Sequence, residues 1–260
     1  MHGQKFIFEL MAVGRYSFTT EQAISAFGVS VVAARAALRR LRQKGELAMP
    51  YKGFYVIVPP EFRNIGCLPA SHFIPDLMNH LKESYYAGLL SAAEYSGAAH
   101  QRPQVFQVVV GRNKPEMICG KVRVQFIARK NVERIPTQDF KTPRGYLKVS
   151  TPAATAFDLV GYAHHAAGLD HVATVLSELA EKLNGEELRQ VADLSPIAWA
   201  QRLGYLLDVV GAQDKTESLA EYIARKKPVT VPLIRAQSFR GISCLKRWRI
   251  WVNAKVEAEV

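Results

Sequence analysis

Three short helical patterns and a hairpin pattern follow one another in the first sixty residues, and this order leaves few folds open to the chain. Apolar residues recur at helical spacing in residues 5–13, 20–27 and 31–44. Two apolar runs then flank a turn at Pro50–Gly53, as in a β-hairpin, and Pro59 and Pro60 close the segment. We therefore expect a three-helix unit with a hairpin directly after its third helix.

The ends of these helices carry residues that start and stop helices. Gly14 ends the first helix, and the hydroxyl of Thr19 or Thr20 is placed to accept a backbone hydrogen bond at the start of the second. Ser30 caps the third helix after the short turn Gly28-Val29-Ser30, and Gly45 stops it in the left-handed conformation. The pattern predicts a helix-turn-helix whose wing is the hairpin.

Positive charge is concentrated in the same segment. The whole chain has a formal net charge of +11, and residues 1–60 hold eight basic and three acidic residues. A charge of this size indicates a polyanionic partner, and its density here favours nucleic acid.

The third helix divides into an inner apolar stripe and an outer basic face. Ala34, Ala37, Leu38 and Leu41 form the inner stripe, and the start of the helix carries the slim residues Ser30, Val31 and Ala33. A helix that enters the major groove has slim residues near its tip and basic residues that hold phosphates. We expect Arg35 to reach a guanine edge and Lys52, at the wing tip, to contact the backbone. The remaining basic residues expected at DNA are Arg39, Arg40, Arg42 and Lys44.

The rest of the chain predicts an α+β fold. A linker over residues 61–75 separates the winged helix-turn-helix of residues 1–60 from a larger mixed domain of residues 76–260 with a modest sheet and a helical bundle. A helical pattern covers residues 74–97, and strands are expected over residues 104–110, 117–129 and 147–150. Thr151-Pro152 is a strong helix start, and further helices are expected near 170–183, 186–193, 196–210 and 215–226. Late strands are expected over residues 230–234 and 247–252.

Three motifs in this second domain, in their order along the chain, resemble those of the AbiEi family. The first lies in residues 84–106, the second is Thr151-Pro-Ala-Ala-Thr-Ala-Phe-Asp-Leu159, and the third is Gln201-Arg-Leu-Gly-Tyr-Leu-Leu207. The chain departs from the first motif at Glu94-Tyr-Ser-Gly97, where the family often has a histidine before the glycine. The motif residues singled out as antitoxin residues are Tyr85, Tyr86, Ser91, Arg102, Pro103, Asp158, Gln201 and Arg202.

The resemblance implies two roles. AbiEi proteins are antitoxins of bacterial toxin–antitoxin and phage-defence operons, in which a winged helix binds inverted repeats of the operon's own promoter as a repressor. The second domain neutralises a toxin that resembles a nucleotidyltransferase. The alternatives are a winged-helix regulator that senses a small effector and, less favoured, an enzyme that cleaves DNA.

The sequence offers little for catalysis or for a cofactor. Asp139-Phe-Lys141 resembles a nuclease motif only weakly, and no phosphate-cradling loop or nucleophile motif occurs. His164 and His165 form the densest group of metal-ligating residues, with Asp158, Asp170 and His171, but adjacent helical side chains point about 100° apart. We therefore expect no enzyme, metal or cofactor.

The remaining composition bears on where the protein works. Cys67, Cys119 and Cys244 fit no zinc spacing and are expected to be buried or inert thiols. The sequence has no apolar run of about eighteen residues, and the N-terminal stretch does not resemble a secretory signal. We expect a cytoplasmic protein with no membrane partner.

Overall fold

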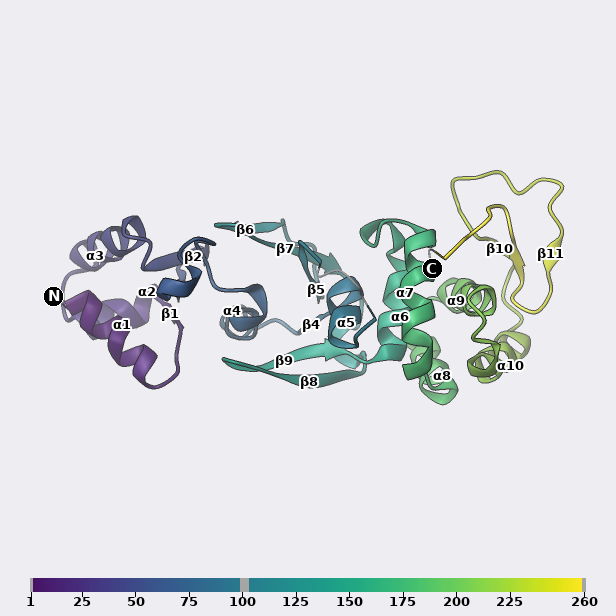
Figure 1. Ribbon diagram of the computed structural model, residues 1–260, viewed down its shortest axis with the longest axis horizontal. Helices are drawn as coiled ribbons and strands as arrows, with labels where there is room; N and C mark the ends of the chain where they lie inside the picture. The colour runs from purple at the N-terminus through teal and green to yellow at the C-terminus, as the bar shows by residue number, and fades with distance from the viewer. Residues whose placement is uncertain (1, 99–102, 259–260) are drawn as a thin grey trace. The chain divides into compact units, whose positions relative to one another are not determined.

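The computed structural model describes residues 2–98 and 103–258 and has the predicted α+β character (Figure 1). Contacts divide the chain into two compact units. The first joins residues 1–86, 104–132 and 139–148, and the second joins residues 87–103, 133–138 and 149–260. The winged helix therefore shares a compact unit with strands that come much later in the sequence.

The winged helix-turn-helix contains three helices and a three-stranded sheet. The helices are α1 (His2–Ala12), α2 (Thr20–Phe27) and α3 (Val31–Gln43), and the strands are β1 (Ser17–Thr19), β2 (Leu47–Tyr51) and β3 (Phe54–Ile57). Strand β3 pairs antiparallel with both β1 and β2. Strand β2 is irregular between Ala48 and Tyr51, and this irregularity accommodates Pro50, which has no amide hydrogen for a regular ladder.

Both helix caps of the helix-turn-helix form as the sequence predicts. The hydroxyl of Thr19 accepts a hydrogen bond from the backbone amide of Gln22, whose side chain bonds back to the amide of Thr19. Gly28 ends α2 in the left-handed conformation with φ of 60°. The hydroxyl of Ser30 then caps α3 by accepting from the amide of Ala33.

An aromatic and aliphatic core holds the three helices together. Leu38, 1% exposed, lies in this core with Leu41 and Ala34 of α3. The ring of Phe6 contacts Phe18 and Phe27 edge-on at centroid distances of 5.1 and 5.5 Å. One face of α3 is thereby fixed in the interior.

The segment expected to be a linker contributes to a second core of the first unit. Leu68 and Phe73 are fully buried and pack in one cluster with Phe54 and Val56 of the wing and with Val108 of the later sheet. The segment also carries the short 3-10 turns Pro60–Phe62 and Ala70–His72 and leads into α4 (Ile74–Leu81).

The larger sheet has the strand order β6-β7-β5-β4-β9-β8. Its strands are β4 (Tyr85–Ala87), β5 (Phe106–Val110), β6 (Met117–Cys119), β7 (Val122–Ala128), β8 (Thr137–Thr142) and β9 (Gly145–Ser150). Strands β5 and β7 are parallel, and β6 and β7 divide the strand expected over residues 117–129 into an antiparallel hairpin.

The helix-rich stretch expected over residues 74–97 contains two helices, with a strand between them that the sequence did not predict. Lys82 ends α4 in the left-handed conformation, strand β4 follows, and a separate helix α5 (Leu89–Tyr95) begins after the extended Gly88. The Tyr-Tyr pair of β4 has the aromatic composition that sheets favour, and it interrupts the helical spacing.

The second unit is built around a buried helix. Helix α6 (Pro152–Gly161) starts at the predicted Thr151 cap, is buried from Ala153 to Val160, and packs against α5. Around it lie α7 (Leu169–Leu179), α8 (Gly185–Asp193) and α9 (Ile197–Val209), and α10 (Glu217–Lys226) packs on α8 and α9. The end of the chain adds a small sheet of β10 (Val231–Pro232), β12 (Ile250–Trp251) and β11 (Cys244–Leu245).

Because Leu38 is enclosed by the winged-helix core, we expect Leu38→Ala to lower the free energy of unfolding by about 2–5 kcal/mol. Val13→Ala is the matched control, since Val13 is 70% exposed and surface changes of this kind stay within about 0.5 kcal/mol. A guanidinium titration of both variants measures the difference. Equal losses would contradict the assignment of Leu38 to the core.

Candidate nucleic-acid interface

Helix α3 and its C-terminal end present basic side chains on the flanks and the outward face around the buried stripe. Arg35, Arg39, Arg40, Arg42 and Lys44 are all exposed. Within the described residues, no carboxylate lies within ion-pair distance of any of them. Their recorded contacts are weak ones, from Arg40 Nε to the Ala36 carbonyl at 3.4 Å and from Arg42 Nη1 to Met49 Sδ at 4.0 Å. Their charges are therefore available to an anionic partner.

An acidic residue that senses the charge of Arg35 lies at the start of α2. The backbone amide of Glu21 and the hydroxyl of Thr19 lower the pKa of the Glu21 carboxyl below its usual value, and His80 and Arg35 contribute less. Glu21 is therefore charged at neutral pH, as is common in the first turn of a helix. It is one of three acidic residues in the first sixty positions, so the surface remains strongly basic.

The start of α3 is slim, as the sequence predicts. Ser30, Val31 and Ala33 are all exposed, and no acidic residue lies in the first turn. The wing turns at Lys52-Gly53, where Gly53 has φ of 80°, and the side chain of Lys52 is exposed at the tip. All nine residues expected at DNA are thus solvent-accessible on the winged helix.

Sequence reasoning missed two residues of the outward face of α3. At about 100° per residue, Val32 and Gln43 lie opposite the buried stripe together with Arg39, whereas Arg35 lies on its flank. Gln43 also lines an open cavity of about 480 Å³ with Arg39 and Arg42. A count of the helical turn from Leu38 would have found both residues.

The residues of the first two antitoxin motifs are mostly interior. Tyr86 is fully buried, Ser91 is 1% exposed and Asp158 is fully buried. Tyr85 and Pro103 are half-buried, and burial raises the pKa of Tyr85 to about 12. Arg102 lies outside the described residues. Side chains in these buried positions support the core of the units that contain them.

The third motif holds the end of the chain in place. Gln201 Nε2 donates to the carbonyls of Val229 and Arg249 at 3.1 and 2.8 Å. The guanidinium of Arg202 is largely buried and donates to the carbonyls of Leu233 and Pro232, both at 2.9 Å. These bonds satisfy backbone oxygens in and beside the final strands, so both side chains tie this segment to α9.

Packing against a tryptophan explains why the third motif has a glycine at position 204. Trp248 is fully buried, and a Cβ placed on Gly204 would overlap its indole ring. The indole Nε1 donates to Asp208 Oδ2 at 2.6 Å, which fixes the ring over α9. The third motif therefore binds and packs against residues 229–251, which we call the C-terminal strap.

Two family models match this chain, each over a different part of it. The family described as AbiEi antitoxin C-terminal domain matches residues 86–209, and the family described as transcriptional regulator, AbiEi antitoxin, matches residues 6–58. The two matches together take in more than half of the chain. The chain belongs to the AbiEi family. No curated protein matches it in sequence.

A solved structure shares the AbiEi chain's fold. It is the crystal structure of the RV2827C protein from Mycobacterium tuberculosis, with a TM-score of 0.66 and 17% sequence identity over 95% of this chain and 89% of that one. At this identity the likeness concerns the fold alone. It extends over nearly the whole of both chains, so the α+β architecture is common to them.

The AbiEi chain's groups with catalytic or metal-binding chemistry are dispersed. Among residues 2–98 and 103–258, no three His, Cys, Asp or Glu side chains are placed to hold a metal ion. The expected divergence of His164 and His165 is wrong, because their side chains turn toward each other and the ring centroids lie 4.0 Å apart. Burial, and to a lesser degree His164, lowers the pKa of His165.

The three cysteines differ in exposure. Cys67 and Cys119 are buried, whereas Cys244 is exposed.

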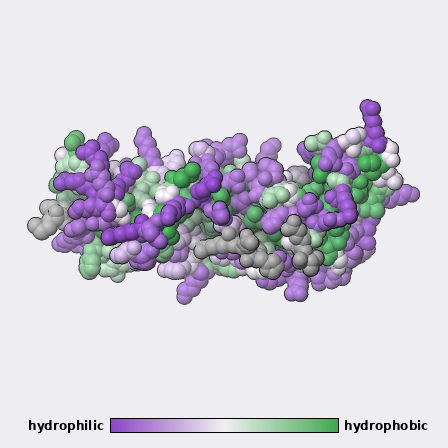
Figure 2. Space-filling view, turned by 45° about the horizontal axis from the view of Figure 1, so that its top comes forward, coloured by the Kyte–Doolittle hydropathy of each residue, from purple (hydrophilic) through white to green (hydrophobic). Residues whose placement is uncertain are grey.

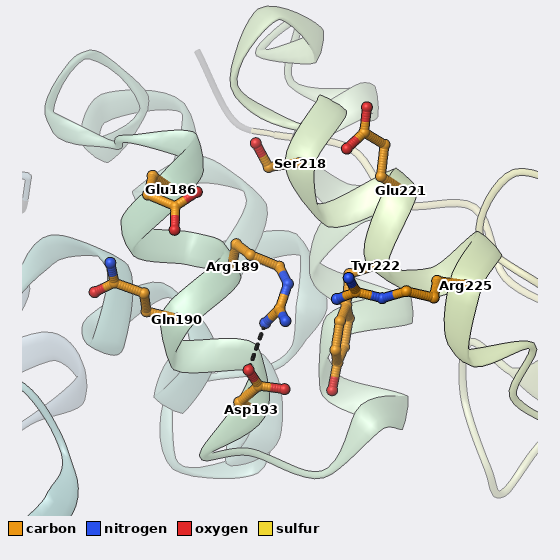
Figure 3. Close-up of a pocket in the computed structure, with 8 residues that line it drawn as sticks. All are labelled: Glu186, Arg189, Gln190, Asp193, Ser218, Glu221, Tyr222 and Arg225. Carbon is orange, nitrogen blue, oxygen red and sulfur yellow. Dashed lines mark hydrogen bonds and ion pairs between the residues drawn. The ribbon is translucent and has the colours of Figure 1, made fainter.

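A polar pocket lies between α8 and α10 of the AbiEi chain (Figure 3). It has a volume of about 450 Å³. Arg189 bonds Asp193 at 2.7 Å, and its guanidinium lies 4.3 Å from the ring centroid of Tyr222. Effector sites are mostly apolar with a few polar groups, whereas charged and polar side chains dominate here.

Among the residues that the structure describes, no helix has the length and apolarity of a membrane span.

The contact of Trp248 with Gly204 predicts an unusual sign for a helix substitution. Replacing glycine by alanine inside a helix normally stabilises by about 1 kcal/mol. Gly204→Ala should instead destabilise the AbiEi chain by about 1–3 kcal/mol, because the new methyl group overpacks against the indole.

The matched background is Trp248→Ala, which removes the obstacle. In that background Gly204→Ala should become neutral or stabilising. Thermal unfolding of the wild type, both single variants and the double variant measures the coupling. Equal costs in the two backgrounds would show that the indole does not exclude a side chain at residue 204.

Proposed function

We propose that this chain is a DNA-binding autorepressor of its own toxin–antitoxin operon and that its second unit neutralises the cognate toxin. The observation that carries the DNA-binding part is the exposed basic surface of α3, whose cations have no described carboxylate partner. A basic helix of this kind, followed by a wing, has the charge and shape to follow a DNA groove. The regulator and antitoxin families matched by the two parts of the chain support the pairing of these roles.

The chemistry of the interface assigns different tasks to its residues. Arg35, one turn into α3, would contact a guanine edge with both arms of its guanidinium. Arg39, Arg40, Arg42, Lys44 and Lys52 supply positive charge for phosphates. Ser30, Val31 and Ala33 leave room for the tip of α3 to approach base edges. The proposed target is double-stranded DNA with inverted repeats in the operon's own promoter.

The toxin side of the proposal rests on family membership. The partner is a toxin that resembles a nucleotidyltransferase, neutralised in the cytoplasm by direct contact or through its target. Ser91, Asp158, Gln201 and Arg202 would then act by shaping the second unit, since their side chains are buried, whereas Tyr86 is buried in the first unit. Tyr85 and Pro103 keep partial exposure.

Gel-shift titrations against the DNA upstream of the operon test the first role. Arg35→Ala should weaken binding to the specific site by about 1–3 kcal/mol and relax the sequence preference, whereas Lys52→Ala should weaken all sequences alike and lower the salt dependence. Arg63→Ala is the matched control, because Arg63 is also exposed but lies outside α3 and the wing. Equal losses on specific and random DNA for Arg35→Ala would contradict its base contact.

Co-expression with the toxin of the same operon tests the second role. The full chain, produced from an unrelated promoter, should restore growth. The double variant Arg35→Ala, Arg39→Ala should lose operator binding and still restore growth, because neutralisation is assigned to the other unit. Failure of the wild-type chain to restore growth would refute the antitoxin role, and failure of the folded double variant alone would show that neutralisation needs DNA binding.

A further inference from the structure

The outward face of α3 is apolar at its start. Val32 is 78% exposed, and its neighbours Val31 and Val29 are 44% and 41% exposed. A single exposed valine is ordinary on a protein surface. Three within four positions, at the tip of the most basic helix of the winged helix-turn-helix, form a small apolar surface that we call the valine tip. Figure 2 shows hydrophobic residues among hydrophilic ones on the surface over α1–α3.

Two arginines of α3 follow the valine tip along the helix. Arg35 follows it by one turn, and Arg39 lies on the same outward face as Val32 at i+7 spacing. No acidic residue lies in the first turn of α3. The occupant of this surface must therefore combine dense negative charge with an apolar group within reach of a helix tip.

The major groove of DNA meets both requirements. Phosphates line its edges, and thymine is the base that places a methyl group in it. Valine offers two methyl groups and no hydrogen-bonding group, so it gains nothing from guanine, cytosine or adenine edges and gains apolar burial from thymine. Because the start of a recognition helix is the part that meets base edges, the position of these valines on α3 suits this contact.

We propose that the valine tip reads thymine methyl groups, so that the preferred DNA sites carry thymines opposite the start of α3. This inference rests on the proposed DNA-binding function and names the base chemistry that the interface selects. Val32 and Arg35 are three residues apart, a rise of about 4.5 Å along the helix. The thymines are therefore placed within about two base pairs of the base that Arg35 contacts.

The experiment removes single methyl groups from the DNA. Preferred sequences are first selected from random duplexes with the full chain, and each thymine of the selected site is then replaced, one at a time, by deoxyuridine. We expect about fourfold weaker binding at one or two positions of each half-site, which corresponds to about 0.8 kcal/mol for one buried methyl-sized group.

The variant Val32→Ala ties the effect to the valine tip. At the positions read by Val32 it should bind thymine and uracil duplexes about equally, and it should keep the wild-type loss at other thymines. Val13→Ala, which changes an equally exposed valine outside α3, should show the full wild-type pattern. Both variants change solvent-exposed side chains, so both are expected to fold.

The outcomes separate this inference from the function on which it rests. Selection that enriches no sequence would overturn the DNA-reading function and the inference together. An enriched site that tolerates uracil at every position, or a uracil penalty unchanged by Val32→Ala, would overturn only the thymine reading. A lower mass of free Val32→Ala than of the wild type in sedimentation would show that the valine tip joins two copies of the chain, which also refutes the reading.

Discussion

The packing of Ala34, Leu38 and Leu41 into the winged-helix core determines which residues of α3 face solvent. A rotation of α3 by one residue would turn Val32 and Arg39 by about 100° and bring polar or charged side chains toward the core. Phe18 and the neighbouring Phe6 and Tyr55 rings lie in the same core cluster as the buried stripe of α3. The direction of the basic and apolar groups is thus a consequence of core packing, and the proposed DNA-reading function would depend on the same residues that stabilise the fold.

The second unit shows a different relation between motif and role. Its motif residues lie in the interior, where Gln201 and Arg202 bind backbone carbonyls and Gly204 makes room for Trp248. A family pattern built from such residues therefore reflects how the unit packs and how α9 holds the C-terminal strap. Residues that meet a partner lie on the surface, where physical constraints on residue type are weaker, and a motif of this kind does not identify them.

The sequence predicted local structure well at helix ends, where capping residues and left-handed glycines have a specific structural role. Thr19, Ser30 and Gly45 sit at the helix ends expected of them, and Thr151-Pro152 starts α6. The sequence was less informative where pairing with other strands determines the structure. Strand β4 was included in a helical stretch. Strand β8 is a polar and mostly exposed edge strand, so its sequence has no alternation of apolar and polar residues that would indicate a strand. At the interface, composition drew attention to arginines, and Val32 and Gln43 were missed because their importance lies in their angle on α3 rather than in their charge.

The two kinds of group on α3 respond differently to salt. Arginine–phosphate contacts release counterions and weaken steeply as salt rises, whereas apolar contacts with a base edge do not. Under the proposed function, the basic surface would draw the chain to any DNA, and the valine tip with Arg35 would separate one sequence from another. Since discrimination is the difference between specific and random binding, it survives conditions in which the affinity itself falls. An interface of this composition suits a repressor that must find a small number of sites in a large excess of other DNA.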